Sequence, residues 1–142
     1  MDKLKPEHRS WNMSRIRSSN TKPELIVRSI LHRMGFRFRL HRKDIPGKPD
    51  IVLPKYKTVI FVHGCFWHRH EGCKYAYTPK SRVDFWTAKF KANTQRDIKV
   101  KKQLDELKWN TFVIWECELS DINSLETRIQ NYFSRLEKIR VT

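Results

Sequence analysis

The sequence predicts a single α/β domain in which a mixed central sheet is flanked by helices. Segments whose apolar residues recur at helical spacing alternate with short runs rich in β-branched residues. No internal repeat, glycine- and serine-rich linker or low-complexity run divides the 142 residues, a length typical of one domain. A block of cysteine and histidine at residues 63–73 adds the donors of a structural zinc site to this fold.

The first half of the chain predicts an arm, a helix and three strands. Residues 1–20 are polar and basic, and we expect an arm that orders on a partner. Thr21 and Glu24 form a capping box at the start of a helix that Gly35 ends. Alternating or continuous apolar runs then predict strands, the last of them central and buried on both faces. These strands cover residues 36–40, 50–53 and 58–62.

The second half of the chain predicts a long helix, a strand and a final helix. Ser81 to Asp84 resembles a capping box and starts a helix that runs to about Leu107. Residues 111–115 are a further buried strand, and apolar residues from Leu125 to Ile139 follow at helical spacing.

The charge of the chain predicts a polyanionic partner. Lys and Arg number 30 against 15 Asp and Glu, a formal net charge of +15. Such an excess binds phosphates through counterion release. No apolar stretch approaches the roughly 20 residues that span a bilayer. The polar N-terminus predicts no export signal, and three cysteines predict reduced thiols or metal ligands. We therefore expect a cytoplasmic protein, associated with the nucleoid if bacterial.

Four residues are candidate zinc ligands. Cys65, His70 and Cys73 have the spacing C-x4-H-x2-C within one loop, and Cys117 follows the predicted strand 111–115. Together they predict a closed, tetrahedral Cys3His site, which is structural because it keeps no open position for a substrate. Spacing alone leaves His68 or His63 as alternatives to His70.

A second constellation predicts phosphodiester hydrolysis. If residues 50–53 and 58–62 form a hairpin, Asp50 lies across from Phe61 or Val62. Its carboxylate could then share a hard divalent cation with a backbone carbonyl near Val62. In a basic chain, a carboxylate with Mg²⁺ indicates a nuclease. The candidates for the base and for a residue that orients a metal-bound water are His63, His68 and Glu24.

Aromatic residues in the same loop predict a DNA wedge. Phe66 and Trp67 lie in a polar, metal-tied loop that is a poor place to bury two rings, so we expect them to be exposed. Inserting a ring costs roughly a few kcal/mol per base step, and least beside a mismatch. Trp86 begins the long helix, and Lys89 and Asn93, one turn apart on it, are expected to contact bases or phosphates.

These motifs together resemble one family. Pro-Gly-Lys-Pro-Asp50, followed by Val-Ile-Phe-Val-His-Gly-Cys-Phe-Trp-His68, resembles the very-short-patch-repair (Vsr) mismatch endonucleases of the PD-(D/E)xK nuclease superfamily. The resemblance covers nearly the whole chain. Further matching segments are Asn12-Met13, Phe85-Trp86, Asn93 with Arg96-Asp97, and Val113-Ile-Trp-Glu-Cys117.

The resemblance implies a restriction-endonuclease-like fold and a Mg²⁺-dependent nick. The nick falls on the 5′ side of the thymine in a T·G mismatch, the product of 5-methylcytosine deamination, and starts very short patch repair. We therefore expect a monomeric protein whose partner is double-stranded DNA containing the T·G mismatch, with mismatch-repair proteins as further candidate partners. The implied residue roles are a metal carboxylate (Asp50), a metal-bound backbone carbonyl (Val62), a general base (His68), neighbours of the metal waters (His63, Glu24), zinc ligands (Cys65, His70, Cys73, Cys117), a major-groove wedge (Phe66, Trp67, Trp86) and a minor-groove contact (Met13).

The chain departs from the superfamily pattern at several positions. Phe61-Val62-His63 occupies the (D/E)-x-K positions, a divergence that the family itself shares, and Val62 stands where many members carry Thr. Arg69 and Gly72 interrupt what is a denser histidine run in relatives. A zinc-stabilised DNA-binding protein without catalysis is the alternative function, and a sequence-specific restriction enzyme is a third. A pure binding protein has no need of Asp50 together with His63 and His68.

Overall fold

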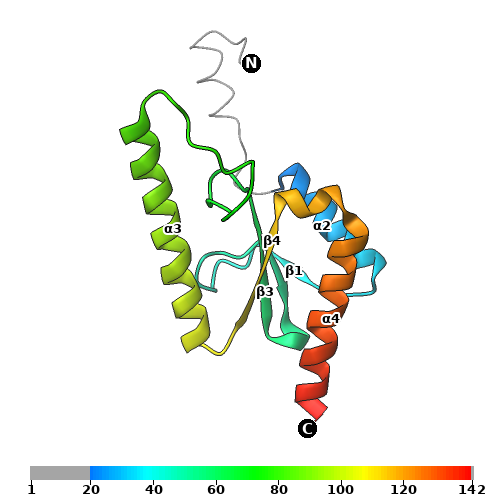
Figure 1. The fold of residues 1–142 in the computed structure, drawn as a ribbon. Coiled ribbons are helices and arrows are strands. Elements are labelled where there is room, and N and C mark those ends of the chain that lie inside the picture. The colour runs from blue at the N-terminus through cyan, green and yellow to red at the C-terminus, as the bar shows by residue number, and fades with distance from the viewer. Residues whose placement is uncertain (1–19, 142) are drawn as a thin grey trace.

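A helix, three strands, a helix, a strand and a final helix follow one another along residues 20–141, the part of the chain that the computed structural model describes (Figure 1). Met13 and the predicted arm lie outside these residues, apart from Asn20. No helix in the described part is long and apolar enough to cross a membrane. The elements are α2 (Lys22–Arg33), β1 (Arg39–Leu40), β2 (Ile51–Leu53), β3 (Thr58–His63), α3 (Val83–Glu106), β4 (Asn110–Trp115) and α4 (Ile122–Val141), with 3-10 turns at Pro54–Tyr56 and Glu116–Ser120.

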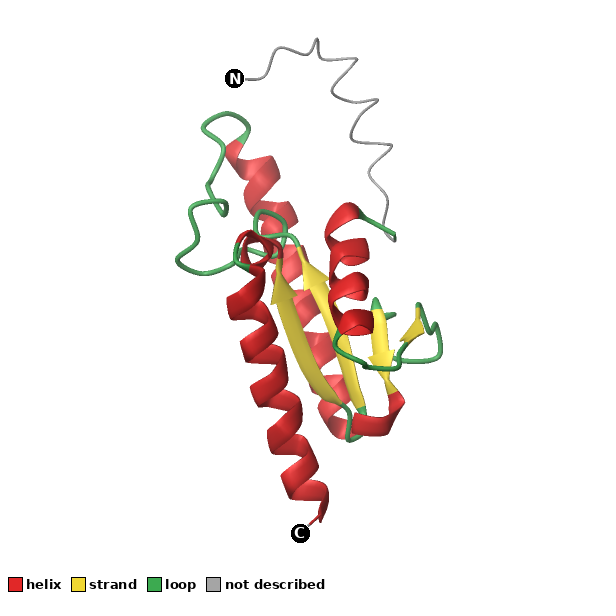
Figure 2. Ribbon diagram, turned by 90° about the vertical axis from the view of Figure 1, so that its right-hand side faces the viewer, coloured by secondary structure: helices red, strands yellow, loops and turns green. Residues whose placement is uncertain are grey.

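The four strands form a mixed sheet in the order β1-β2-β3-β4. β2 is antiparallel to β1 and β3, whereas β3 and β4 are parallel, and two arrowheads in Figure 2 accordingly point the same way. Parallel pairing runs through to His63 opposite Trp115, so the carboxyl ends of β3 and β4 lie side by side. The loop after β3 and the turn after β4 therefore begin at one edge of the sheet.

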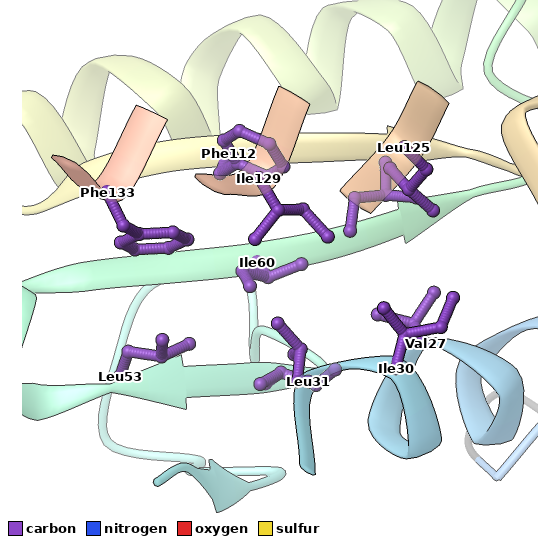
Figure 3. Close-up of a cluster of buried hydrophobic side chains, with 11 residues drawn as sticks. Val27, Ile30, Leu31, Leu53, Ile60, Phe112, Leu125, Ile129 and Phe133 are labelled. Atoms are coloured by element: carbon purple, nitrogen blue, oxygen red, sulfur yellow. The ribbon is translucent and has the colours of Figure 1, made fainter. Parts of the chain in front are cut away.

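The sheet is covered on both faces, which confirms the predicted α/β fold (Figures 1 and 2). α2 and α4 pack on one face and α3 on the other. Alternate residues of β2 and β3 point to opposite faces, and this explains why both strands are continuous apolar runs. The larger core on the α2 and α4 face contains Val27, Ile30, Leu31, Ile51, Leu53, Ile60, Phe112, Ile114, Leu125, Ile129 and Phe133 (Figure 3). The smaller core under α3 contains Ile45, Val52, Val59 and Leu104.

Two local predictions are wrong. The strand at 36–40 shrinks to Arg39–Leu40, both exposed, while Phe36 and Phe38 pack on the larger core from the segment before it. The alternating pattern predicted which side chains are buried, but it did not predict how many residues pair with β2. α3 starts at Val83 after Arg82, whose φ is 54°, and no side chain of the described residues caps it, so Ser81 is not its N-cap.

Candidate active site and metal centre

Asp50 directly precedes β2 and lies beside the end of β3. The register pairs Ile51 with Ile60, as the predicted hairpin requires, and the Val62 N–H donates to Asp50 Oδ2 over 2.9 Å. The pKa of the Asp50 carboxyl is raised to about 6, chiefly by its burial. The Val62 amide, His41 and His68 pull the pKa down and the nearby Glu24 pushes it up, and burial outweighs them. Asp50 is thus a half-buried carboxylate whose negative charge is not fully balanced by its neighbours, which suits it to a divalent cation.

The Asp50 charge should lower the stability of the protein at neutral pH when no divalent cation is added. The folded-state pKa of about 6 lies above the ordinary 3.8, so folding favours the protonated form. The protonated Asp50 carboxyl contributes its whole stabilisation below about pH 4, and this contribution is lost as the pH rises through 6. The unfolding free energy of Asp50→Asn, compared with that of the unaltered protein, should therefore rise by about 2 kcal/mol from pH 4 to pH 8. Urea titrations of both proteins at pH 4 and at pH 8 measure this difference in unfolding free energy. A difference that does not change with pH would contradict the prediction.

Gly47 explains how the loop before Asp50 approaches α3. Its φ is +79°, and a Cβ at this position would lie 2.4 Å from Val100 Cγ1. Only glycine accepts both this backbone conformation and this closeness. The Pro-Gly-Lys-Pro segment therefore lies against α3, next to the smaller core.

His63, His68 and Asp97 form a second group beside Asp50. His68 Nδ1 lies 2.7 Å from Asp97 Oδ2, and the rings of His63 and His68 stack with centroids 3.8 Å apart. Burial first, and then the neighbouring His68, lower the pKa of His63 to about 4. His63 is therefore neutral at pH 7 and a weak base. His68 has a carboxylate that orients its ring, so its Nε2 is the better placed nitrogen to accept a proton.

Glu24 belongs to a third group, on the α2 side of Asp50. Its side chain is 2% exposed, and Oε1 lies 2.5 Å from both Arg28 Nη2 and His41 Nε2. Thr21 caps α2 as predicted, since its Oγ1 accepts the Glu24 N–H over 3.3 Å. The reciprocal bond differs from the prediction, because Glu24 Oε2 accepts the N–H of Asn20 rather than that of Thr21.

A cleft of about 770 Å³ joins Asp50 to the group formed by His63, His68 and Asp97. It is lined by Asp50, Val62, His63, His68 and Asp97, together with basic residues such as Lys48 and Arg96. Carboxylates that suit a metal, an oriented imidazole and cations that suit phosphate thus share one hollow beside the carboxyl ends of β3 and β4.

The predicted Cys3His group is assembled at the same edge of the sheet. The candidate ligand atoms of Cys65, His70, Cys73 and Cys117 all lie within 4.8 Å of one another. His63 and His68, the alternatives to His70, belong to the other group. The His70 ring stacks on Trp115 with centroids 4.1 Å apart, and the Cys117 N–H donates to Cys65 Sγ over 3.4 Å.

The donor set of this group fits a tetrahedral metal ion. Burial raises the pKa of Cys65 to about 12 and also raises that of Cys117, whereas the Tyr75 backbone hydrogen bond lowers the pKa of Cys73. Two of the three thiols therefore resist ionisation by themselves. A bound cation reverses this by stabilising the thiolates, as thiolate–metal sites do. Three thiols and one imidazole leave no open position, which is the pattern of a structural site.

The aromatic side chains of the loop form a cluster and are half-buried, less exposed than predicted. The Phe66 ring has the rings of Trp67, Trp86 and Phe90 within 5.5 Å, centroid to centroid. Phe90 is buried beneath them. The cluster therefore rests on the first turns of α3.

Arg69 and Asn93 hold this cluster in place. The Arg69 guanidinium lies 3.9 Å from the Phe90 ring centroid and donates to the Tyr77 carbonyl over 2.8 Å. The Asn93 side-chain amide, which the sequence predicts to contact DNA, donates to the Trp67 carbonyl over 3.2 Å. Lys89 is exposed on α3, where a phosphate can reach it.

Comparison with known proteins assigns the chain to a family. The sequence profile described as DNA mismatch endonuclease Vsr matches residues 1–74. The chain is 53% identical over 130 residues to the type II nicking enzyme V.XorIIP of Xanthomonas oryzae pv. oryzae (strain KACC10331 / KXO85), covering 92% of this chain and 95% of that enzyme. It is 40% identical over 111 residues to DNA mismatch endonuclease Vsr of Escherichia coli (strain K12), covering 78% of this chain and 70% of that one.

The chain belongs to the Vsr family of DNA mismatch endonucleases.

It is therefore a DNA endonuclease, as the resemblance implied. A third relative, the type II nicking enzyme V.NmeAIP of Neisseria meningitidis serogroup A / serotype 4A (strain DSM 15465 / Z2491), is 50% identical over 113 residues, 80% of each chain.

Sequence reasoning missed two residues that the structure places beside the predicted site residues, His41 and Asp97. Asp97 lies one helical turn after Asn93, so the same face of α3 contacts the loop at Trp67 and at His68. That spacing is a signal that sequence reasoning could have used. His41 follows a two-residue strand in a basic segment, and nothing in the local sequence distinguishes it from a loop histidine.

Proposed function

We propose that this Vsr-family endonuclease nicks DNA on the 5′ side of the thymine in T·G mismatches in a Mg²⁺-dependent reaction. Such mismatches arise when 5-methylcytosine is deaminated, and the nick would start very short patch repair by a monomeric enzyme. One observation carries the proposal: the half-buried Asp50 carboxylate and the His68–Asp97 pair line one cleft, beside the loop that contributes three donors of the Cys3His group.

Asp50 is the side chain proposed to hold Mg²⁺, together with the backbone carbonyl of Val62. Its raised pKa supports this role, since a nearby cation removes the unfavourable burial of its charge. When bound, Mg²⁺ neutralises charge on the phosphate and lowers the pKa of water. Glu24 and His63 are proposed to hydrogen-bond the water molecules around it.

His68 is proposed as the general base. Asp97 holds the ring by Nδ1, so Nε2 takes the proton from the attacking water. The proton then rests on an imidazolium that Asp97 stabilises electrostatically. His63, kept neutral by burial, stacks on His68 and fixes the plane of its ring.

The loop supplies mismatch recognition in this proposal. Zinc bound by Cys65, His70, Cys73 and Cys117 would hold the loop rigid. Phe66, Trp67 and Trp86 would then stack against the destabilised T·G step from the major groove, while Lys89 binds backbone phosphate. Met13, proposed for the minor-groove side, lies outside the described residues.

A nicking assay tests the proposal directly. End-labelled duplexes that differ only in one pair, T·G or T·A, are incubated with the enzyme and Mg²⁺. The proposal expects a single cut on the thymine strand of the T·G duplex alone. A zinc-stabilised binding protein without catalysis would bind the T·G duplex without cutting it. A restriction enzyme would cut both strands of a paired duplex, and either result would overturn the proposal.

Asp97→Asn should reduce the single-turnover nicking rate by about 10²-fold, because an amide neither stabilises the imidazolium nor selects the correct tautomer. The affinity for the T·G duplex should change less than about twofold, since Asp97 acts through His68. Quenched-flow nicking and fluorescence anisotropy measure the two quantities. Asp105→Asn is the matched control, as Asp105 pairs with Lys101 on the exposed face of α3. An equal loss in both variants would remove Asp97 from the site.

A further inference from the structure

The fold holds His41 next to Asp50 by strand pairing. Leu40 pairs with Ile51 in the antiparallel β1–β2 register, so His41, the residue after β1, lies opposite Asp50. The His41 N–H donates to the Asp50 carbonyl over 3.4 Å, and a left-handed φ of 49° turns the chain at this residue. The imidazole is therefore brought to Asp50 by the sheet and does not reach it from a free loop.

The imidazole points at both carboxylates of the site. His41 Nε2 lies 2.5 Å from Glu24 Oε1, and the candidate ligand atoms of Glu24, His41 and Asp50 all lie within 4.8 Å of one another. These ligand atoms are close enough together to share one ion. Glu24 is 2% exposed and His41 31% exposed, so the group is enclosed on the α2 side.

The charge of this group favours a cation. Arg28 Nη2 contacts Glu24 Oε1 over 2.5 Å and approaches His41 Nε2 at 3.2 Å. One guanidinium thus stands against two carboxylates when Asp50 and Glu24 are ionised, which leaves one negative charge uncompensated. A divalent ion supplies the missing positive charge, and an imidazole nitrogen adds a donor that carries no negative charge of its own.

We propose that His41 is a second side-chain ligand of the divalent cation held at Asp50, with Glu24 remaining beside the metal-bound water, and that His41 gives this site a preference for Mn²⁺ over Mg²⁺. The inference rests on the proposed role of Asp50. Mg²⁺ prefers oxygen donors in near-ideal octahedral geometry. An imidazole nitrogen is a softer donor that first-row transition ions accept more readily. The enzyme is then served by either ion but binds Mn²⁺ more tightly.

Mn²⁺ binding to the zinc-loaded protein tests this inference without reference to activity. His41→Gln removes the imidazole but keeps an amide that can donate to Glu24. Titration followed by electron paramagnetic resonance should show the Mn²⁺ affinity falling at least about tenfold, with Mg²⁺ affinity, measured by competition, changing less than about threefold. His32→Gln is the matched control, since His32 is an exposed histidine near the end of α2. Equal loss for the two ions, or none, would overturn the preference.

A spectroscopic signature separates a ligand from a residue that only hydrogen-bonds Glu24. Electron spin-echo modulation from a histidine nitrogen should appear in Mn²⁺-loaded protein, change on ¹⁵N-histidine labelling of the unaltered chain, and vanish in His41→Gln but not in His32→Gln. Modulation that persists in His41→Gln, or is absent from the unaltered chain, would overturn the inference. The labelled chain provides this result even if the variant fails to fold.

The Asp50→Asn variant distinguishes this inference from the proposed function. If Asp50 holds the cation, this variant loses both Mn²⁺ and Mg²⁺ binding, whatever His41 does. Unchanged binding of both ions would contradict the proposed metal role of Asp50. Loss of both ions in Asp50→Asn, with unaltered Mn²⁺ binding in His41→Gln, would leave the proposed function standing and reject His41 alone.

Discussion

Asp50→Asn should reduce the single-turnover nicking rate on a T·G duplex by at least about 10³-fold. The amide keeps the size of the side chain and an oxygen that can accept the Val62 N–H, so the hairpin should be preserved. It removes the charge that is proposed to hold Mg²⁺. Affinity for the duplex, measured by anisotropy without added Mg²⁺, should stay within about threefold of wild type, because phosphate contacts come from the basic surface.

Asp44→Asn provides the control for this experiment. Asp44 lies in the loop before β2, is exposed and pairs with Arg42, away from the group around Asp50. The control should nick at the wild-type rate. Normal nicking by Asp50→Asn would remove the proposed metal role, whereas equal loss in both variants would indicate damage to the loop.

Cys117→Ser should abolish the zinc binding proposed for the Cys3His group and destabilise the protein. Cys117 follows β4, whereas the other three donors lie in the loop after β3, so the ion would join two segments that are far apart in sequence. Structural zinc contributes about 10–16 kcal/mol in isolated zinc fingers. Even a fraction of this should lower the melting temperature by roughly 10 °C or more. The zinc content measured by elemental analysis should fall from about one ion per chain towards none.

A double variant tests whether the losses of zinc and of stability come from one site. Cys73→Ser should produce the same losses, and combining it with Cys117→Ser should add little, since the ion is already gone. Full zinc content and an unchanged melting temperature in Cys117→Ser would exclude this cysteine as a ligand. Mismatch preference should also fall in both variants, because the loop carries Phe66 and Trp67.

Local pattern was a reliable guide where each residue's environment follows from its neighbours. The apolar run at 58–62 predicted a strand buried on both faces, and α3 on one side with α2 and α4 on the other accounts for it. Pattern failed where tertiary contacts decided the outcome. Phe36 and Phe38 alternate like strand residues, but they reach the core from unpaired backbone, and β1 is only two residues long.

The donors of the Cys3His group could also be predicted from local sequence. Cys65, His70 and Cys73 lie within nine residues of one another, so one loop can bring them together, and Cys117 was the remaining cysteine. Choosing His70 over His63 and His68 required the fold. In the structure the loop turns His70 onto Trp115 and turns His68 towards α3.

The sequence by itself determined the fold class, the donor types and the family, because periodicity and motif spacing are local properties of the chain. Only the tertiary structure decided which groups act on one another. His41 meets Asp50 through β1–β2 pairing, and Asp97 meets His68 because α3 packs across the sheet. In both contacts the two segments are brought together because the two hydrophobic cores are buried. That burial involves residues far apart in sequence, so a short stretch of sequence does not reveal it.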